Sequence, residues 1–256
     1  MGEFTQLGED DANLRAGIGE LAGLVAGRRS LPESLADIAG AAVRAIPGAD
    51  GVGVALFRSG QPGDVVASSS SGAALAAQCD RIQYVTLREG PAFTAVRERT
   101  AVQSGSLGGD KRWPRFGPRV GRLGVHSVLA LPLVVADQVV GAISVYAHGK
   151  DAFDPHSADL AELFTTPAAV AVHNAQVLAH AQVLTERLQA ALLTRPVVDQ
   201  AVGLIRGRTG LSAEDALEHL RAISQSEQRK LVEVAQSLVD EAVRRARART
   251  SPGPAV

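Results

Sequence analysis

Apolar residues recur at helical spacing on both sides of the chain's central region. The first set consists of Leu35, Ile38, Ala39, Ala42, Val43 and Ile46. Ser30 and Glu33 stand before it at the spacing of a capping box and Pro47-Gly48 ends it, so a helix is predicted between them. The second set consists of Leu160, Leu163, Phe164, Val170 and Val177. Asp154 and Pro155 precede it as a typical N-cap and first helical residue, which predicts another helix.

Between these helices, apolar residues alternate with small or polar ones at the period of two that is typical of β-strands. Strands are predicted at Gly51–Leu56, Val65–Val66, Ile82–Leu87 and Thr100–Val102. The apolar runs Val125–Val135 and Val139–Ala147 are separated only by Ala136-Asp137-Gln138, which is the length of a hairpin turn. We therefore predict an α+β domain in which helices flank one antiparallel sheet.

The last quarter of the chain carries three further apolar stripes at helical spacing. They run over Val197–Ile205, Ala216–Ile223 and Leu231–Ala242. Gly210 is a natural stop after the first stripe, and Ser212–Asp215 has the spacing of a capping box before the second. Ser224–Glu227 repeats that spacing before the third stripe. Three short helices are therefore predicted. A unit of this size is too small to enclose a catalytic cleft, so we expect its function to depend on residues at its surface.

A connecting helix is predicted over Phe164–Leu193, which is rich in Ala, Val, Leu and Gln. Its positions at three-four spacing are Leu178, Ala181, Leu184, Leu188, Ala191 and Leu192. Such a seam is typical of helices that pair, so we predict that this segment pairs with its copy in a homodimer. Pro167 and Pro196 each lack the N–H that a helix uses, and they are predicted to kink or break the helix as hinges.

Several segments of the α+β part carry a family pattern. They are Arg88-Glu-Gly-Pro91, Arg112-Trp-Pro-Arg-Phe116, Ser127–Leu133, Val140-Gly-Ala142, Ala152-Phe-Asp154 and Ala168–Ala175. Together they resemble the GAF domain family, which implies a sensor and dimerisation domain over residues 30–180, after an N-terminal segment over 1–29. The resemblance also implies a small-molecule ligand, but the family's cyclic-nucleotide signature is absent from the sequence and no ligand-binding residue is identified.

A second family pattern covers the three terminal helices. Its segments are Arg195–Arg206, Ser212–Ala216, Ser224-Gln225, Arg229–Leu231 and Val234-Ala235. They look like the ANTAR family of RNA-binding antitermination domains, here over residues 181–249 with a disordered tail over 250–256. The resemblance implies a three-helix module, usually dimeric, that binds paired hexanucleotide-loop hairpins in nascent mRNA and prevents a terminator from forming. The sequence departs from the family at Val202, where many members carry lysine, and at Gln228, where many carry asparagine.

Arginine is well suited to RNA contact, because its planar guanidinium binds phosphates and base edges and stacks on unpaired bases. The residues predicted to contact RNA are Arg195, Gln200, Arg206, Arg208, Arg229 and Lys230. Asp199 follows Arg195 by one helical turn, so an internal ion pair is the alternative role for that arginine.

The overall charge gives no general attraction to nucleic acid, so any RNA affinity has to come from a local cluster. The 256 residues carry a net charge of -1, and positions 186 to 249 hold eleven basic and nine acidic residues, a margin of +2. The arginines within Arg244–Arg249 are explained equally well by a solvated helix end that complements the helix dipole.

Other candidate sites have simpler explanations. Trp113 and its basic neighbours would suit single-stranded nucleic acid, but loop packing accounts for them better. Gly105–Lys111 lacks the ending of a phosphate loop and is interpreted as a flexible connection. Asp154–Asp159 would suit a metal, yet a helix cap explains its first aspartate. Cys79 has no adjacent histidine, unlike bilin attachment sites, and is interpreted as a plain thiol.

No set of nucleophile, base and orienting residue is readable in the sequence. We therefore predict a protein that is not an enzyme, without catalytic or metal-binding residues and with no assigned cofactor. The single cysteine, the acidic Met1–Asp11 and the absence of an apolar run of membrane length predict a cytoplasmic location. The predicted function is an RNA-binding antitermination regulator gated by a sensor domain. The alternative is a signalling module whose terminal helices dock a partner protein.

Overall fold

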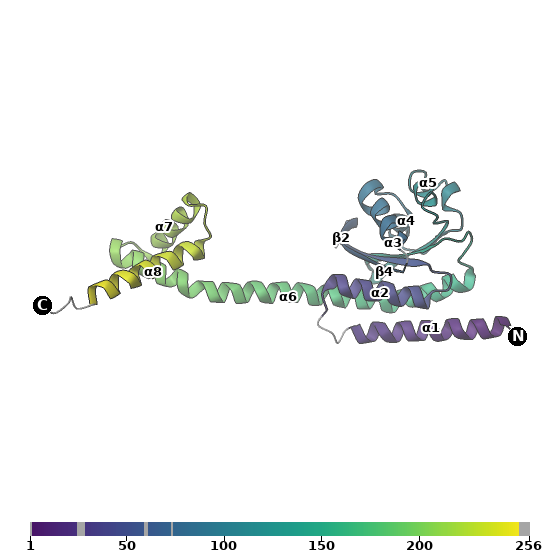
Figure 1. Cartoon of the computed structure of the whole chain (residues 1–256), viewed down its shortest axis with the longest axis horizontal. Helices are drawn as coiled ribbons and strands as arrows, with labels where there is room; N and C mark the ends of the chain where they lie inside the picture. The colour runs from purple at the N-terminus through teal and green to yellow at the C-terminus, as the bar shows by residue number, and fades with distance from the viewer. Residues whose placement is uncertain (1, 25–28, 59–60, 73, 251–256) are drawn as a thin grey trace. The chain divides into compact units, whose positions relative to one another are not determined.

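The computed structural model describes residues 2–24, 29–58, 61–72 and 74–250, and the chain divides into two compact units between His180 and Ala181. Figure 1 shows the elements of each unit. The helix α6 (Pro155–Thr209) belongs to both units, because the division falls within it. Among the described residues, no helix combines the length and the apolar character that crossing a membrane requires.

The first unit is an α+β domain. Its strands are β1 (Gly51–Arg58), β2 (Gln61–Gly72), β3 (Val102–Ser104), β4 (Ser127–Val135) and β5 (Gln138–Ala147). Its other helices are α1 (Gly2–Leu24), α2 (Leu31–Ala45), α3 (Leu75–Asp80), the π-helix η1 (Arg81–Leu87), α4 (Pro91–Glu98), the 3-10 helix η2 (Leu107–Gly109) and α5 (Phe116–Gly121). The strands form one sheet in the order β2-β1-β5-β4-β3, with every neighbouring pair antiparallel, which confirms the predicted architecture.

Each face of the sheet is covered by a different set of helices (Figure 1). On one face, Leu35 and Ile38 of α2 and Phe164 of α6 pack against strand residues in the main core, and α1 packs on α2. On the other face, α3, η1, α4 and α5 enclose two smaller clusters that include Trp113 and Tyr84. The helical layers bury both faces, so the sheet supports a core on each side.

The predicted helix starts and the predicted hairpin are confirmed. Glu33 accepts hydrogen bonds at 2.8 Å from both the backbone N–H and the hydroxyl of Ser30 at the start of α2. Asp154 accepts a 2.7 Å hydrogen bond from the N–H of Ser157 at the start of α6. Ala136 and Asp137 connect β4 to β5, and both have positive φ angles (46° and 63°), as a two-residue type I′ turn requires.

The strand predicted at Ile82–Leu87 is wrong, because this segment forms the π-helix η1. Two consecutive side chains, Gln83 and Tyr84, are buried, which the alternating geometry of a strand does not allow on one face. Gln83 is held in place by the N–H of Ala92, which donates a 2.9 Å hydrogen bond to its Oε1. The strand predicted at Thr100–Val102 begins only at Val102 and runs on to Ser104.

Of the kink or break predicted at each of the two prolines, the break is wrong, and a kink stays a prediction. The helix α6 continues through Pro167 and Pro196 to Thr209. A proline removes only one N–H, and buried residues on either side of Pro167, Phe164 and Ala168 among them, keep this stretch packed on the core.

The helix α1 had no counterpart among the predicted elements. Its buried anchors, Leu14 and Leu21, are few, and a Cβ added at Gly17 would lie only 3.0 Å from Cβ of Ala45. Small residues let α1 approach α2 closely, and they also weaken the apolar pattern from which a helix is predicted.

The second unit is a bundle of three helices, as predicted: the end of α6, α7 (Ala213–Ser226) and α8 (Leu231–Thr250). Its core consists of Ala201, Ile205, Ala216, Leu220, Val234 and Ala235. Gly210 ends α6 with a φ of 74°, and the hydroxyl of Ser212 accepts a 3.1 Å hydrogen bond from the N–H of Asp215 as the N-cap of α7. From residue 251 on, the predicted disordered tail lies outside the described residues.

The capping box predicted at Ser224–Glu227 is wrong. Ser224 lies in the last turn of α7 and Glu227 is the C-cap of that helix, and the hydroxyl of Ser224 donates a 2.6 Å hydrogen bond to the carbonyl of Arg229. The turn then passes through Gln228, whose φ of 52° is left-handed, before α8 begins. Many members of the ANTAR family carry asparagine at the position of Gln228. Asparagine adopts a left-handed conformation more readily than most residues, so the backbone of this turn explains the preference for asparagine.

Candidate nucleic-acid interface

The RNA-contact residues predicted on α6 do not share one side of the helix. Arg195 and Arg206 are eleven residues apart, which is about three turns, so they project in nearly the same direction. Gln200 and Arg208 are turned away from that direction by roughly 120° or more at about 100° per residue. All four side chains are exposed. Arg195 and Arg206 therefore lie on one side of α6, and Gln200 and Arg208 lie on other sides of the helix.

The arginines of α6 differ in their partners. Nε of Arg195 lies 3.8 Å from a carboxylate oxygen of Asp199, and the two side chains are 81% and 70% exposed. Such a solvated pair contributes little and leaves the guanidinium free to exchange partners. Neither the Arg206 nor the Arg208 side chain has a hydrogen bond or an ion pair with any residue that the structure describes. Both guanidinium groups are available for an external anion.

Arg229 is occupied within the bundle. Its Nη1 lies 2.9 Å from a carboxylate oxygen of Glu227, and its Nη2 donates to the Ser237 hydroxyl at 2.8 Å and to the Glu233 carbonyl at 3.3 Å. These bonds tie the turn before α8 to the helix itself. An RNA contact by this residue would have to compete with them.

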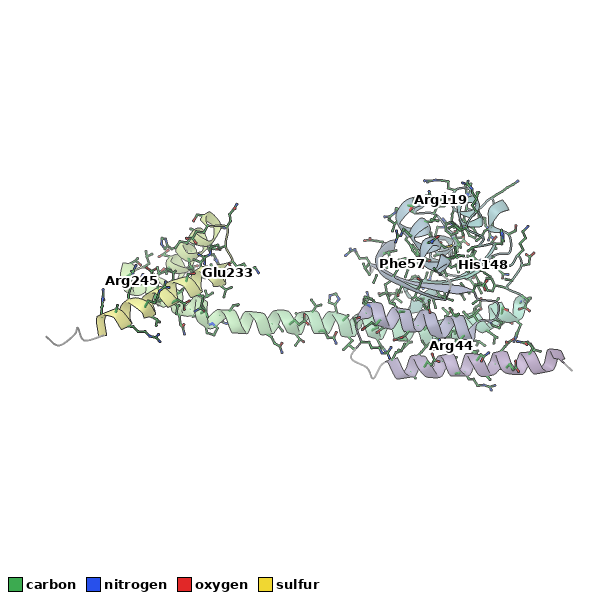
Figure 2. The ribbon with its side chains drawn as sticks, in the orientation of Figure 1. Arg44, Phe57, Arg119, His148, Glu233 and Arg245 are labelled. Atoms are coloured by element: carbon green, nitrogen blue, oxygen red, sulfur yellow. The ribbon has the colours of Figure 1, made fainter. Side chains whose placement is uncertain are left out.

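Lys230 lies next to Arg229, at the N-cap of α8. Its carbonyl accepts hydrogen bonds from the N–H groups of Glu233 and Val234, at 2.9 and 3.2 Å, and its side chain is exposed. A cation at this end of a helix adds to the positive end of the helix dipole, and the combined potential favours an anion. Arg245, in the last part of α8 (Figure 2), is paired with Glu241.

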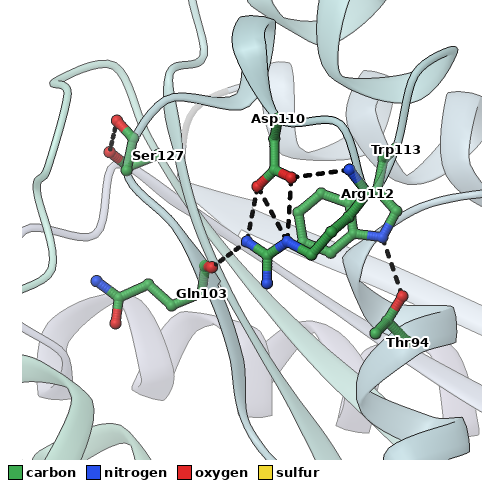
Figure 3. Close-up of polar contacts among 7 residues, drawn as sticks. Thr94, Gln103, Asp110, Arg112, Trp113 and Ser127 are labelled. Carbon is green, nitrogen blue, oxygen red and sulfur yellow. Dashed lines mark hydrogen bonds and ion pairs between the residues drawn. The ribbon is translucent and has the colours of Figure 1, made fainter.

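Trp113 and its neighbour Arg112 in the first unit are packing residues, as predicted (Figure 3). Trp113 is 2% exposed, and its Nε1 donates a 2.9 Å hydrogen bond to the Thr94 hydroxyl. The guanidinium carbon of Arg112 lies 4.4 Å from the centre of the indole. Its hydrogen bonds to Asp110, at 2.6 and 3.0 Å, lower the pKa of that carboxyl to about 2. The ring and the neighbouring guanidinium therefore offer no free stacking platform.

Cys79 is fully buried, which confirms its interpretation as a plain thiol. Burial, with a smaller contribution from the charge of Asp80, raises the pKa of this thiol to about 12. The thiol is protonated near neutral pH and is a poor nucleophile. Within the described ranges, no three His, Cys, Asp or Glu side chains gather as a metal site requires.

A buried polar cluster in the first unit was not predicted. The hydroxyl of Tyr146 donates a 2.8 Å hydrogen bond to Oδ1 of Asp80, and Nε2 of Gln83 donates to the same hydroxyl at 3.3 Å. Burial raises the pKa of Asp80 to about 7. Asp80 and Tyr146 are 66 positions apart, so no short motif could have revealed their contact.

The fold and these sites define a two-domain regulatory protein, with a sensor-type α+β domain followed by a helical module whose cations face solvent. The chain belongs to the GAF domain family, whose model matches residues 29–173. Residues 186–239 match the ANTAR domain model, so the protein is a signal-regulated ANTAR regulator. The two matched domains are signalling and regulatory modules. None of the curated proteins compared with the chain matches it.

Solved structures with a similar fold include the free methionine-R-sulfoxide reductase from Neisseria meningitidis in complex with its substrate. It is 14% identical to this chain, with 64% of this chain and 91% of that chain covered and a TM-score of 0.50. A structure described only as that of the GAF domain is 12% identical, covers 63% and 88%, and has a TM-score of 0.50. The GAF domain of a phosphoenolpyruvate-protein phosphotransferase from Coxiella burnetii is 14% identical, covers 68% and 98%, and has a TM-score of 0.49. At these identities the likeness concerns the fold alone.

Proposed function

We propose that this protein is an RNA-binding transcription antitermination regulator of the cytoplasm. Its GAF domain, residues 30–180, senses a signal and controls the binding of the ANTAR domain, residues 181–249, to two-hairpin leader transcripts. The observation that carries the proposal is the pair of exposed guanidinium groups of Arg206 and Arg208 on a matched ANTAR domain, neither of which has a partner among the described residues. Of the other predicted contacts, Arg195, Gln200 and Lys230 are exposed, and Arg229 contributes through the shape of the turn that it holds.

A homodimer is part of the proposal, and exposed apolar residues of α6 support it. Leu163, Val170, Val177 and Leu184 recur at intervals of seven residues, and Leu188 follows at the intermediate spacing, as in a coiled-coil seam. Leu184 and Leu188 are each 58% exposed in the single chain. Leucines exposed in this way are typical of a surface that a second helix covers. Ala191 and Leu192, which complete the predicted seam, lie outside the side chains that the structure describes.

Binding of RNA is tested by a gel shift of the full chain with a leader RNA that contains two hairpins with hexanucleotide loops. We expect a shift with this RNA and none with a scrambled RNA of equal length and composition. Equal binding of both RNAs at physiological salt would mean that the protein binds RNA only through non-specific electrostatic attraction, which would contradict recognition of the hairpins. Absence of binding, together with capture of one specific protein by the terminal helices, would favour the docking of a partner instead.

The homodimer is tested by light scattering after size exclusion at micromolar concentration, with and without RNA. Leu184→Lys with Leu188→Lys should convert the dimer to a monomer, because two like charges per chain would face each other in the seam. Gln182→Lys with Gln189→Lys is the matched control, since these two exposed residues add the same charge on the side of the helix away from the seam. A monomer for the unchanged chain in both conditions rejects the pairing of α6.

A further inference from the structure

The first unit contains a pocket of about 540 Å³ between the π-helix η1 and the edge strand β2. Its charged and aromatic polar lining consists of Asp64, Asp80, Arg81, Tyr84 and Arg88, and three serines of β2 complete the polar part. The volume lies in the range of small-molecule sites. The wall is an unusual element, because π-helices are rare and occur mostly at functional sites.

A carboxyl group forms the innermost part of this pocket. Asp80 is only 6% exposed, and its Oδ1 accepts the hydrogen bond from Tyr146. Its Oδ2 has no hydrogen-bond partner in the part of the chain that the structure describes, and it lies over Gly53, where any Cβ would collide with it. Gly53 therefore makes room for the carboxyl group on the floor of the sheet.

No cationic side chain among the described residues pairs with Asp80. Burial of a carboxylate is costly unless a cation or several hydrogen bonds compensate it. Tyr146 supplies only one hydrogen bond to Asp80. A positively charged donor would therefore stabilise the ionised carboxylate of Asp80.

Two cations lie at the other side of the same pocket. Arg81 is the first residue of the π-helix and Arg88 is its C-cap. Both are exposed, and neither guanidinium has a hydrogen-bond or ion-pair partner among the described residues. Arginine binds carboxylates with two parallel hydrogen bonds. The pocket thus has a negative inner end and a positive rim, and the apolar surfaces of Val65 and Val85 lie between β2 and η1.

We propose that this pocket binds a free α-amino acid, with the ammonium group on Oδ2 of Asp80 and the carboxylate on Arg81 and Arg88. The proposal deepens the proposed function, on which it rests for the sensing role of the GAF domain. A phosphate or a simple anion would satisfy the arginines but would meet the carboxylate of Asp80. A divalent cation would find two carboxylates in the lining, Asp80 and Asp64, and Asp64 is already paired with Arg58 at 2.7 Å.

The proposal is tested by calorimetric titration of the full chain at pH 8 with each of the twenty natural L-amino acids in turn. We expect at least one to bind with a dissociation constant of millimolar or lower. Its analogue without the amino group and its analogue without the carboxylate should each bind about tenfold more weakly, because each loses a charge-assisted contact. Binding of none of the twenty, or equal binding of either analogue, overturns the proposal.

Variants locate the site. Asp80→Asn, and separately Arg81→Gln with Arg88→Gln, should each weaken binding about tenfold. Arg119→Gln, an exposed arginine of α5 outside the pocket (Figure 2), should leave binding unchanged. The two rim arginines are exposed, so their replacement keeps the test valid even where Asp80→Asn fails to fold. Unchanged binding by the double arginine variant contradicts the assignment. The titration contains no RNA, so a negative titration does not contradict the proposed RNA binding. Likewise, a negative gel shift does not contradict the amino-acid site.

Discussion

The GAF domain buries several polar side chains, whereas all the described buried side chains of the ANTAR domain are apolar. In the GAF domain, Arg112 is paired with Asp110 and covers a buried indole, and Tyr146 donates to the buried Asp80. In the ANTAR domain, Arg206 and Arg208 face solvent without a partner among the described residues. A domain with a large core can enclose polar groups and shape a pocket around them. The core of the ANTAR bundle consists of six small or medium-sized buried residues. Such a bundle carries its polar and charged side chains on the surface.

Leu220→Ala should have the largest effect, because it would unfold the smaller domain alone. Leu220 is fully buried in the ANTAR core, and such a truncation costs about 2–5 kcal/mol, which is comparable to the whole stability of a small domain. Helix content by circular dichroism should fall. The fluorescence of Trp113, the single tryptophan of the chain, should keep its unfolding transition.

Leu211→Ala is the matched control, because this leucine is 36% exposed and lies between α6 and α7. A shift of the Trp113 transition in the Leu220→Ala protein would break the comparison, since it would mean that the two domains do not fold independently.

Asp80→Asn should change how the stability of the GAF domain depends on pH. The pKa of Asp80 is about 7 in the folded protein and near 4 in the unfolded chain, so its contribution is fully present below pH 4 and is lost as pH rises to 7. Between pH 5 and 8 this loss is about 3 kcal/mol, and the asparagine variant should not show it. The titratable groups that face Asp80 are Tyr146, Tyr84 and Cys79, and all three have raised pKa values.

Urea unfolding followed by the fluorescence of Trp113, repeated at several pH values, measures this dependence. Asp110→Asn is the opposite case, because the pKa of Asp110 is lowered to about 2 and its stabilising effect is lost only as pH falls from 4 towards 2. Identical slopes for the unchanged chain and Asp80→Asn between pH 5 and 8 would show that Asp80 does not titrate in this range.

Arg206→Gln with Arg208→Gln should weaken RNA binding about tenfold and lower the salt slope by about 1 to 2, since two phosphate contacts are removed. Stability should not change, because neither side chain has an internal partner among the described residues. Titrations of labelled hairpin RNA at several salt concentrations measure both effects. Arg244→Gln with Arg245→Gln removes the same charge from the exposed last part of α8 and should leave the slope nearly unchanged. An equal loss in both proteins would mean that net charge, not this pair of residues, attracts RNA.

Ser212→Ala and Ser30→Ala form the mildest test, one cap in each domain. Loss of an N-cap costs about 1 kcal/mol in either domain. The melting temperature of the ANTAR domain should fall by about 4–8 °C and that of the larger GAF domain by about 2–4 °C, because the entropy of unfolding grows with domain size. Differential scanning calorimetry resolves the two transitions. Equal shifts would indicate that both domains melt as one cooperative unit.

The sequence predicted those features that depend on neighbours a few residues away. The cap formed by Ser30 and Glu33, the turn at Ala136 and Asp137, and the stop at Gly210 each act through backbone groups within one turn. The same local signals indicated three terminal helices with exposed arginines. The periodicity of the strands was sufficient to predict one antiparallel sheet.

Contacts between distant segments decided the rest. A period of two around Tyr84 is typical of a strand, yet the bond from Ala92 to Gln83 and the packing of Tyr84 hold this segment as a π-helix. Ser224 and Glu227 have the spacing of a cap, but they lie at the end of one helix and not at the start of the next. The pocket at Asp80 depends on Gly53, Tyr146 and β2 together. Local capping and turn chemistry act within a few bonds of the chain, whereas the burial of a charge depends on which remote residues surround it, and only the tertiary structure determines that.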